Sequence, residues 1–447
     1  MPTDGTTFIN PLGLVFTLLM GVLMLVVPRR YALVPVIILT CYMTMGERVM
    51  IGGLNFTMIR ILLLFGWLRL VTRGELHPLK LNPIDKVILF WVASSIVMHT
   101  LLWQSSQEFI NRLGGAYSTI GTYFLFRYLL HDIDDILRVF KIVAVFLAPL
   151  AALMIVEKMT GRNIFAVFGG VPESTYVRDG VLRCQGPFAH PILAGTFGAT
   201  SFPLCVALWW QGRAAKVLAV TGIGACLIII LTSGSSGPVL AGLAGVVGLA
   251  MWTARRHLRK IRWGIVLSLI VLHLVMKAPV WFIIARIDVF SGSTGYHRAY
   301  LIDRAVANLA DWWLVGTKST AAWAAEDDHL YDVTNAYINE GANGGLLTMI
   351  LFIMIIVLCF RGLGNALRTL SGERRSQLAL WAVGSSLFAH AVTFFSVSYF
   401  DQNFVVWFLL LAIISTSTAL VRSPGNAALA PPIAFQPVTS LRLGSEF

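Results

Sequence analysis

Charged residues are scarce in this sequence: Asp, Glu, Lys and Arg together make up only 13% of the 447 residues. Soluble domains carry about 25%. Aliphatic and aromatic residues replace the missing charges, and hydrophobic residues reach 57%. This composition excludes a soluble globule, and it excludes disorder because disordered chains are poor in apolar residues.

Cysteine and alternating strand patterns are also rare. The five cysteines are scattered and form neither a CxxC pair nor a metal-ligand spacing. A disulfide framework and a zinc motif are therefore not indicated. Segments of about 10 residues with alternating polarity, which a membrane β-barrel would require, do not occur.

What the sequence does contain is a succession of apolar runs near 20 residues long, each sufficient to cross about 30 Å of hydrocarbon. Inside lipid every backbone polar group needs an internal partner, so these runs are predicted to be helices. We expect an all-α polytopic membrane protein with about 12–13 transmembrane helices in one domain, residues 1–442. Residues 443–447 have the composition of a cloning scar and are left out. The runs lie near residues 9–27, 31–47, 56–72, 85–103, 113–130, 137–157, 189–210, 215–232, 236–254, 263–283, 343–360, 377–399 and 404–421.

The formal net charge of +12 could indicate a nucleic-acid partner. The basic residues instead sit in short clusters between apolar runs, which is typical of cytoplasmic loops under the positive-inside rule. We therefore expect no nucleic-acid partner and a cytoplasmic C-terminus. The clusters are 29–30, 69–86, 213–216, 255–262 and 361–375.

Two long loops then fall on the outer face, near residues 158–189 and 285–341. The second contains an amphipathic helical pattern that begins at Arg298, which we expect to lie flat on the membrane surface. Its apolar face is formed by Leu301, Ala305, Leu309 and Trp312, with Trp312 and Trp313 expected at the headgroup level.

Ionisable side chains inside spans are functional candidates by default, although packing histidines and snorkelling cations are common alternatives. Both interpretations stay open for the set found here: Arg60, His99, Arg127, His273, Lys277 and His390.

The outer loops carry richer polar clusters. The first contains Arg178, Arg183 and His190-Pro191, and the second contains His297-Arg298. Two arginines on separate loops form a candidate diphosphate clamp, because the guanidinium fork matches phosphate oxygens. The alternative is that these arginines pair with nearby acids or lipid headgroups.

These loop segments resemble motifs of the bacterial O-antigen ligase and O-antigen polymerase superfamily. The resemblance covers roughly residues 140–420 and rests on the order and spacing of several weak motifs. The matching stretches are Arg183 through His190-Pro191 to Gly195, Thr232 to Gly237, Arg298 through Leu314-Val-Gly316, and Thr334-Asn335 through Gly345-Leu346.

The resemblance implies a membrane glycosyltransferase that moves a glycan from undecaprenyl diphosphate to a glycan or lipid acceptor, by polymerisation or ligation. It implies inversion at the anomeric carbon at the outer face of the bacterial inner membrane. Because no DxD pair occurs in a suitable setting, we expect no metal and no cofactor. Polysaccharide-assembly partners are also expected.

The resemblance also implies the site residues. Thr334 stands where ligases of the family have a histidine, and threonine cannot act as a base near neutral pH. The catalytic candidates are therefore His329, Asp332, His297 and Asn335. The diphosphate-binding candidates are Arg183, Arg298, His190 and Arg304.

Two other functions remain open. A secondary transporter or flippase for a polysaccharide precursor usually shows repeated halves and interrupted helices near the membrane midplane. A non-catalytic scaffold of a polysaccharide-assembly complex would explain the missing histidine.

Overall fold

The computed structural model describes residues 9–51, 54–286, 295–323, 333–370 and 373–422. Helices dominate these ranges, and the sheet content described there consists of two short antiparallel hairpins. The expected all-α polytopic architecture is confirmed.

The α-helices are α1 (Pro11–Val26), α2 (Val34–Tyr42), α3 (Met58–Thr72), α4 (Pro83–Trp103), α5 (Ser106–Leu129), α6 (Ile133–Thr160), α7 (Pro191–Ala207), α8 (Arg213–Thr232), α9 (Ser236–Ala250), α10 (Leu258–Val275), α11 (Gly295–Ala307), α12 (Leu309–Trp312), α13 (Ala336–Thr369), α14 (Arg374–Thr393) and α15 (Gln402–Arg422). The strands are β1 (Arg48–Ile51), β2 (Leu54–Thr57), β3 (Tyr176–Arg178) and β4 (Val181–Arg183). Short 3₁₀ turns are η1 (Arg29–Tyr31), η2 (Ile164–Phe168), η3 (Leu208–Trp210), η4 (Arg255–His257), η5 (Val280–Arg286) and η6 (Ala321–Trp323).

Polar residues explain where several helices begin and end. The Asn82 side chain accepts a hydrogen bond from the backbone N–H of Asp85, and the Asp85 carboxylate accepts one from the backbone N–H of Asn82. This reciprocal capping box starts α4. Gly161, with φ 67°, ends α6 in the left-handed conformation that favours glycine.

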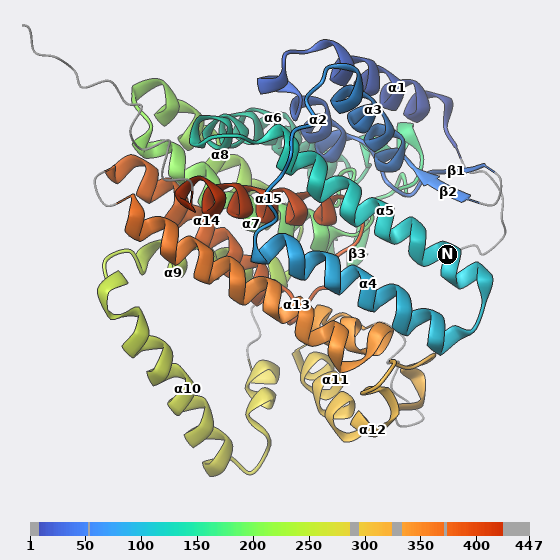
Figure 1. Cartoon of the computed structure of the whole chain (residues 1–447). Helices are drawn as coiled ribbons and strands as arrows, with labels where there is room; N and C mark the ends of the chain where they lie inside the picture. Colours follow the sequence, from blue (N-terminus) through green and yellow to red (C-terminus); the bar gives the residue numbers. More distant parts are fainter. Residues whose placement is uncertain (1–8, 52–53, 287–294, 324–332, 371–372, 423–447) are drawn as a thin grey trace, which may run out of the picture.

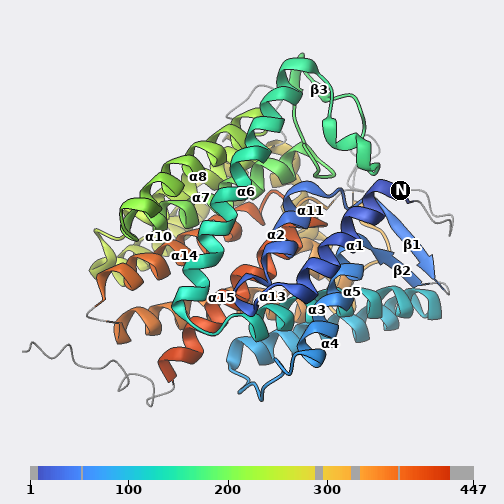
Figure 2. The ribbon, with the colours of Figure 1, turned by 90° about the horizontal axis from the view of Figure 1, so that it is seen from above.

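The centre of the bundle is α7, which packs against α8, α9 and α14. Figure 1 labels all four helices in the same part of the bundle, and Figure 2 shows α7 beside α8. A Cβ at Gly195 would lie 2.4 Å from Ser233 Oγ, so glycine there allows α7 to approach the turn between α8 and α9 closely. That contact fixes the position of the turn beside the start of α7.

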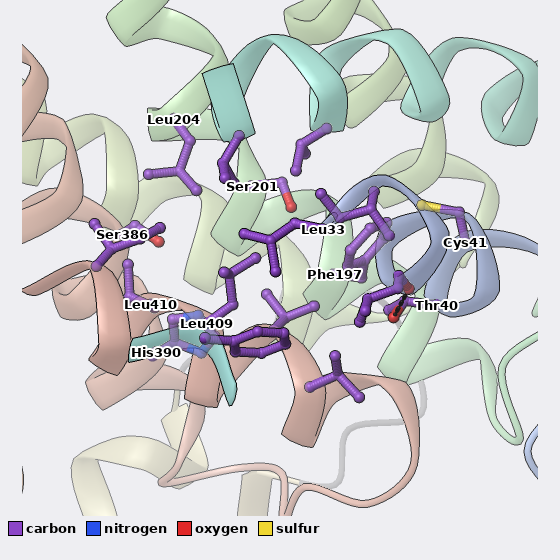
Figure 3. Close-up of a pocket in the computed structure, with 18 residues that line it drawn as sticks. Leu33, Thr40, Cys41, Phe197, Ser201, Leu204, Ser386, His390, Leu409 and Leu410 are labelled. Carbon is purple, nitrogen blue, oxygen red and sulfur yellow. Dashed lines mark hydrogen bonds between the residues drawn. The ribbon is translucent and has the colours of Figure 1, made fainter. Parts of the chain in front are cut away.

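A small cavity of about 30 Å³ lies among α2, α6, α7, α14 and α15 (Figure 3). Its lining is mostly aliphatic and aromatic, with Thr40, Ser201, Ser386 and His390 as polar members. His390 Nδ1 lies 2.6 Å from the Tyr399 hydroxyl. This buried contact favours the packing interpretation of His390.

Side-chain contacts gather the basic loops at one end of the bundle. Arg29 pairs with Asp135 at 3.1 Å, and Arg69 donates to the Val27 carbonyl oxygen at 2.7 Å. At the same end Asn82 donates to Ser415 Oγ at 2.7 Å, near the end of α15. The start of α15 lies at the other end, where the two long loops are.

The expected count of 12–13 transmembrane helices is not reached. Every expected run contains a helix, but six helices in the described ranges are long and apolar enough to span a membrane. The number is up to seven if α9 and α10, which are bent by 94°, form one span. The helices α1, α2 and α3 are too short, and α5 and α14 are too polar.

The second long loop differs from the expectation at one point. Leu301, Ala305 and Trp312 are buried together against α13. The Trp312 indole N–H donates to the Ala305 carbonyl oxygen at 2.8 Å. Trp312 is therefore a packing residue, and its expected place at the headgroup level is wrong, whereas Trp313 is exposed. The physical reason is that Leu301, Ala305 and Trp312 cover α13, whereas Leu309 of the same expected face is exposed.

Candidate functional site

A cavity of about 900 Å³ lies where the two long loops meet. Its walls come from the β3–β4 hairpin, residues 317–320, residues 396–400 and the starts of several helices. Five basic side chains face it, against one acidic side chain, Asp179, among the described residues that line it. The basic residues are Lys158, Arg178, Arg183, Arg298 and Lys318.

The hairpin that carries Arg183 is built by local sequence. Asp179 and Gly180 form its two-residue turn with φ values of 52° and 75°, as the Asp-Gly pair favours. The backbone N–H of Cys184 then donates to the Thr232 carbonyl oxygen at 3.0 Å. This bond fastens the hairpin to the turn between α8 and α9.

That turn also holds the Arg183 side chain. Arg183 Nη2 donates to Ser235 Oγ at 2.5 Å, and its guanidinium lies 5.7 Å from the centre of the Tyr176 ring. Gly234, with φ 54°, leaves room for the side chain, because a Cβ there would lie 3.0 Å from Arg183 Cγ. Arg183 Nε is buried and has no hydrogen-bond partner among the described residues.

Arg298 reaches the same cavity from the first turn of α11. Its side chain is only 8% exposed. Across the described ranges it makes no hydrogen bond and no ion pair. A buried guanidinium without an anion is costly, so both arginines are arranged to receive a negatively charged group.

Burial and a neighbouring positive charge both lower the pKa values of Arg183 and Arg298. Burial lowers the pKa of the Arg183 guanidinium, and the nearby Arg178 charge lowers it further. The same two causes lower the pKa of Arg298. Both groups remain cationic, but their charge is poorly solvated, which strengthens the attraction for an anion in this cavity.

Helix starts add to the positive potential. The helices α7, α9, α11 and α13 all begin at the cavity, which is lined by residues of their first turns or caps. The Ser235 hydroxyl caps no N–H of α9, because it donates to the Ser233 carbonyl oxygen and accepts from Arg183. Open N–H groups and aligned helix dipoles favour bound anions.

His190 caps α7 and faces the same cavity. Its Nδ1 accepts a hydrogen bond from the backbone N–H of Ile192 at 3.1 Å, so the proton of the neutral ring is on Nε2. Burial lowers the pKa of His190 to about 4, and the Arg183 and Arg178 charges contribute. At neutral pH His190 is therefore a donor to the cavity and not a base.

One buried carboxylate organises the first long loop. Glu157, at the end of α6, accepts from the backbone N–H groups of Gln185 at 3.1 Å and Gly186 at 2.8 Å. Asn163 Nδ2 donates to the Gly186 carbonyl oxygen at 2.8 Å. These bonds fix the segment that links Arg183 to His190.

No protein-family model and no curated protein matches this chain. Its fold is weakly similar to a chain from a structure described as "Structural coordination of polymerization and crosslinking by a peptidoglycan synthase complex". The TM-score is 0.38 and the sequence identity is 14%, over 76% of this chain and 96% of that chain. Similarity at this level gives no argument for function.

The structure brings together four of the predicted site residues: Arg183, Arg298, His190 and His297 all line the cavity. Thr334 lines it as well, and its buried Oγ1 has no hydrogen-bond partner in the described part of the chain.

Two predicted residues lie elsewhere, and two cannot be placed. Arg304 is not part of the cavity lining and pairs with Asp303 at 3.0 Å. Asn335 is buried as the N-cap of α13, where its Oδ1 accepts from the backbone N–H of Ile338 at 3.2 Å. His329 and Asp332 lie outside the described residues.

Sequence reasoning missed several lining residues. Arg178 is only five residues before Arg183 and belongs to the same polar cluster of the first loop, but it was not among the diphosphate-binding candidates, although its charge was a usable signal. Ser235 stands in the Thr232–Gly237 stretch. Lys158 begins the first long loop and Lys318 lies within the second. Neither belongs to a motif, so only the fold shows that they line this cavity.

Proposed function

We propose that this chain transfers a glycan from a polyprenyl diphosphate carrier to an acceptor hydroxyl, at the outer face of a bacterial inner membrane. The observation that carries the proposal is the pair Arg183 and Arg298, buried in one cavity without a carboxylate partner among the described residues. A diphosphate supplies the two negative groups that such a pair requires.

The reaction breaks the bond between the anomeric carbon and the diphosphate oxygen. The acceptor hydroxyl oxygen forms the new bond to that carbon from the opposite side, which inverts its configuration. Negative charge grows on the departing diphosphate, and Arg183 and Arg298 are placed to stabilise it as preorganised donors. The His190 Nε2–H is a third donor of the same kind.

The proton of the acceptor hydroxyl must pass to a base. His297 is the candidate that lines the cavity, next to Arg298. His329 and Asp332 remain candidates from the sequence. Because the neutral His190 ring uses Nδ1 to cap α7, it lacks the free lone pair that this role requires.

A flippase for the same lipid is a second candidate, and one observation favours it. Gly344 and Gly345 have non-helical backbone angles, so α13 is two helices joined at a break. Ala342 and Asn343, next to this break, line the cavity. Interrupted helices at the substrate site are common in transporters.

Specific activity of arginine variants tests the transferase proposal. Polymer or conjugate formed per mole of folded protein is measured for Arg183→Ala, Arg183→Lys, Arg298→Ala and Arg298→Lys. The alanine variants should lose about tenfold to a hundredfold, because a charge-assisted contact contributes about 1.5–3 kcal/mol. Lysine should rescue poorly, since it lacks the two-pronged geometry.

The matched control is Arg368→Ala, an exposed arginine on α13. Near-normal specific activity in both alanine variants would remove the diphosphate clamp. Translocation of a labelled lipid-linked glycan across proteoliposomes, with no transfer product, would support the flippase instead.

A further inference from the structure

One wall of the cavity contains a single charged side chain among the described lining residues and is otherwise rich in neutral hydroxyl and amide groups. Residues 317–320 and the first turns of α13 form it. Its one cation among the described lining residues, Lys318, has its Nζ 5.8 Å from the centre of the Trp103 ring. The neutral polar members are Thr317, Ser319, Thr320, Asn339 and Asn343.

A hydrogen-bonded chain leads to this wall from α4 and α5. Arg112 Nη2 lies 3.0 Å from His99 Nδ1. Because arginine can only donate, His99 Nδ1 accepts and the ring proton is on Nε2. His99 Nε2 then donates to Glu108 Oε2 at 3.2 Å. Arg112 is thereby held with its guanidinium against α13.

The same guanidinium fixes the orientation of Asn343. Arg112 Nη2 donates to Asn343 Oδ1 at 3.0 Å. The Asn343 amide must therefore turn its Nδ2 the other way, and this group donates to Asn339 Oδ1 at 2.9 Å and to the Asn339 carbonyl oxygen at 2.8 Å. Asn339 Oδ1 thus already accepts one hydrogen bond, whereas its Nδ2 donates none among the described residues and is available to the cavity.

The break in α13 makes this arrangement rigid. The backbone N–H of Thr317 donates to the Ala342 carbonyl oxygen at 2.7 Å, and that of Leu346 donates to the Trp313 carbonyl oxygen at 2.8 Å. Residues 313–317 therefore hold α13 on each side of its break, and Asn343 lies directly before that break.

We propose that Asn339 is a glycan-binding residue of this cavity, and that Arg112 and Asn343 are positioning residues that hold its amide with the N–H groups outward. The inference rests on the proposed function, because it takes the neutral part of a lipid-linked glycan as the ligand. Sugar hydroxyl and ring oxygens accept hydrogen bonds, and a neutral donor binds them without competing for the diphosphate. A site built to donate rejects ligands that lack the acceptor.

Binding selectivity tests the inference. The protein in nanodiscs is titrated with undecaprenyl diphosphate and, separately, with lipid-linked glycans extracted from the cells in which the chain is native. Native mass spectrometry reads the bound species. Wild-type protein should bind the glycan-bearing lipid about tenfold more tightly than undecaprenyl diphosphate, as one well-placed hydrogen bond to a sugar allows.

Asn339→Asp removes the amide donor from the cavity. Asn343→Asp removes the hydrogen bond that orients Asn339, since a carboxylate at position 343 can accept from Arg112 but cannot donate to Asn339. Both variants should lose the tenfold preference, which is the ratio of the two dissociation constants within each variant. The added carboxylate repels the diphosphate that both lipids share, so it weakens both constants and leaves the ratio to report the lost sugar contact. Arg112→Gln keeps a donor for Asn343 and should retain more of the preference than Arg112→Leu. The matched control is Asn365→Asp, the same change at an exposed position of α13.

Each outcome is decisive. An unchanged preference in Asn339→Asp or Asn343→Asp overturns the proposal, as does a wild-type protein that binds both lipids equally. A wild-type protein that binds neither lipid overturns the proposed function itself. Equal loss in the Arg112→Gln and Arg112→Leu variants would contradict the positioning role of Arg112.

Discussion

Arg298 and Arg127 are both buried arginines, and the contrast between them separates binding from stability. Arg127 Nε pairs with Asp85 at 3.2 Å, and Arg127 Nη1 donates to Thr416 at 2.9 Å. Arg298 has no such partner in the described ranges. The sequence left Arg127 open between a functional role and snorkelling, but it lies in a buried ion pair between α4 and α5.

This contrast gives a stability prediction. Arg298→Met should raise the thermal unfolding temperature of the ligand-free protein, because it replaces an unpaired buried charge with an apolar side chain. Arg127→Met should lower the free energy of unfolding by about 3–5 kcal/mol, because Asp85 would be left uncompensated. Unfolding followed by tryptophan fluorescence checks both. A lower unfolding temperature for Arg298→Met would show that Arg298 supports the fold.

His190 gives a prediction about pH. Its folded-state pKa of about 4 lies below the unfolded value of about 6.5. Folding stability from this group is fully present above pH 6.5 and is lost as pH falls toward 4, because the unfolded chain takes up the proton first. His190→Asn should remove this part of the pH dependence of unfolding.

Variants of His190 separate its role as the cap of α7 from its role as a hydrogen-bond donor to the cavity. Asparagine can still cap α7, whereas His190→Ala should cost about 1 kcal/mol of stability. Both variants lose the Nε2–H donor, so both should lose activity. Over pH 5–8 the shape of the activity profile should stay that of wild type, because His190 is neutral throughout. A changed profile in His190→Asn would contradict this assignment.

At the scale of elements, the break in α13 connects two motifs that are far apart in sequence. Gly316, with φ 98°, and Gly345, with φ 72°, lie where the chain before residue 317 packs against the break. A Cβ at Gly345 would lie 2.2 Å from the Leu314 carbonyl oxygen. The glycines of both motifs are therefore needed by backbone geometry and close approach.

Substitution at the break should be severe. Gly345→Ala should sharply reduce the amount of folded protein, since a Cβ is strained there and collides with backbone. The control Gly364→Ala is in the same helix with nothing within 4 Å of the added atom. It should be neutral or stabilising by up to about 1 kcal/mol. Fluorescence-detected size exclusion compares the two. Equal yields would mean that the break can relax.

The sequence predicted part of the cavity lining and not its long-range contacts. Motif order predicted one site for Arg183, His190, His297 and Arg298, and all four line the same cavity. Arg304 does not line it, because the six residues after Arg298 rotate a side chain by about 240° around a helix. The Arg112–Asn343 contact was not foreseeable, since no local pattern pairs residues 231 positions apart.

At the scale of the whole molecule, the two ends of the helix bundle differ in the loops that they contain. Basic loops gather at one end, and both long loops meet the cavity at the other. Amphipathic pattern could not show that the apolar face of α11 covers α13 instead of lipid, because lipid and protein interiors select the same residues. The positive-inside rule predicts that the basic end is cytoplasmic and that the cavity lies at the outer face.

Cysteine labelling can test on which side of the membrane the cavity lies. The five native cysteines are buried, so cysteines introduced at exposed positions can be labelled selectively. An impermeant reagent on intact cells should label Ser319→Cys, beside the cavity, and spare Arg259→Cys. Labelling of Arg259→Cys alone would place the cavity on the cytoplasmic side and overturn the outer-face assignment.

The central claim is that one cavity binds a lipid-linked diphosphate through two arginines. The most direct measurement is the dissociation constant of undecaprenyl diphosphate for the purified protein, with undecaprenol as the ligand that lacks the diphosphate. Wild type should bind the diphosphate far more tightly than undecaprenol, and Arg183→Ala and Arg298→Ala should each weaken it by about tenfold to a hundredfold. Equal dissociation constants for the two lipids, or for wild type and both variants, would contradict the account.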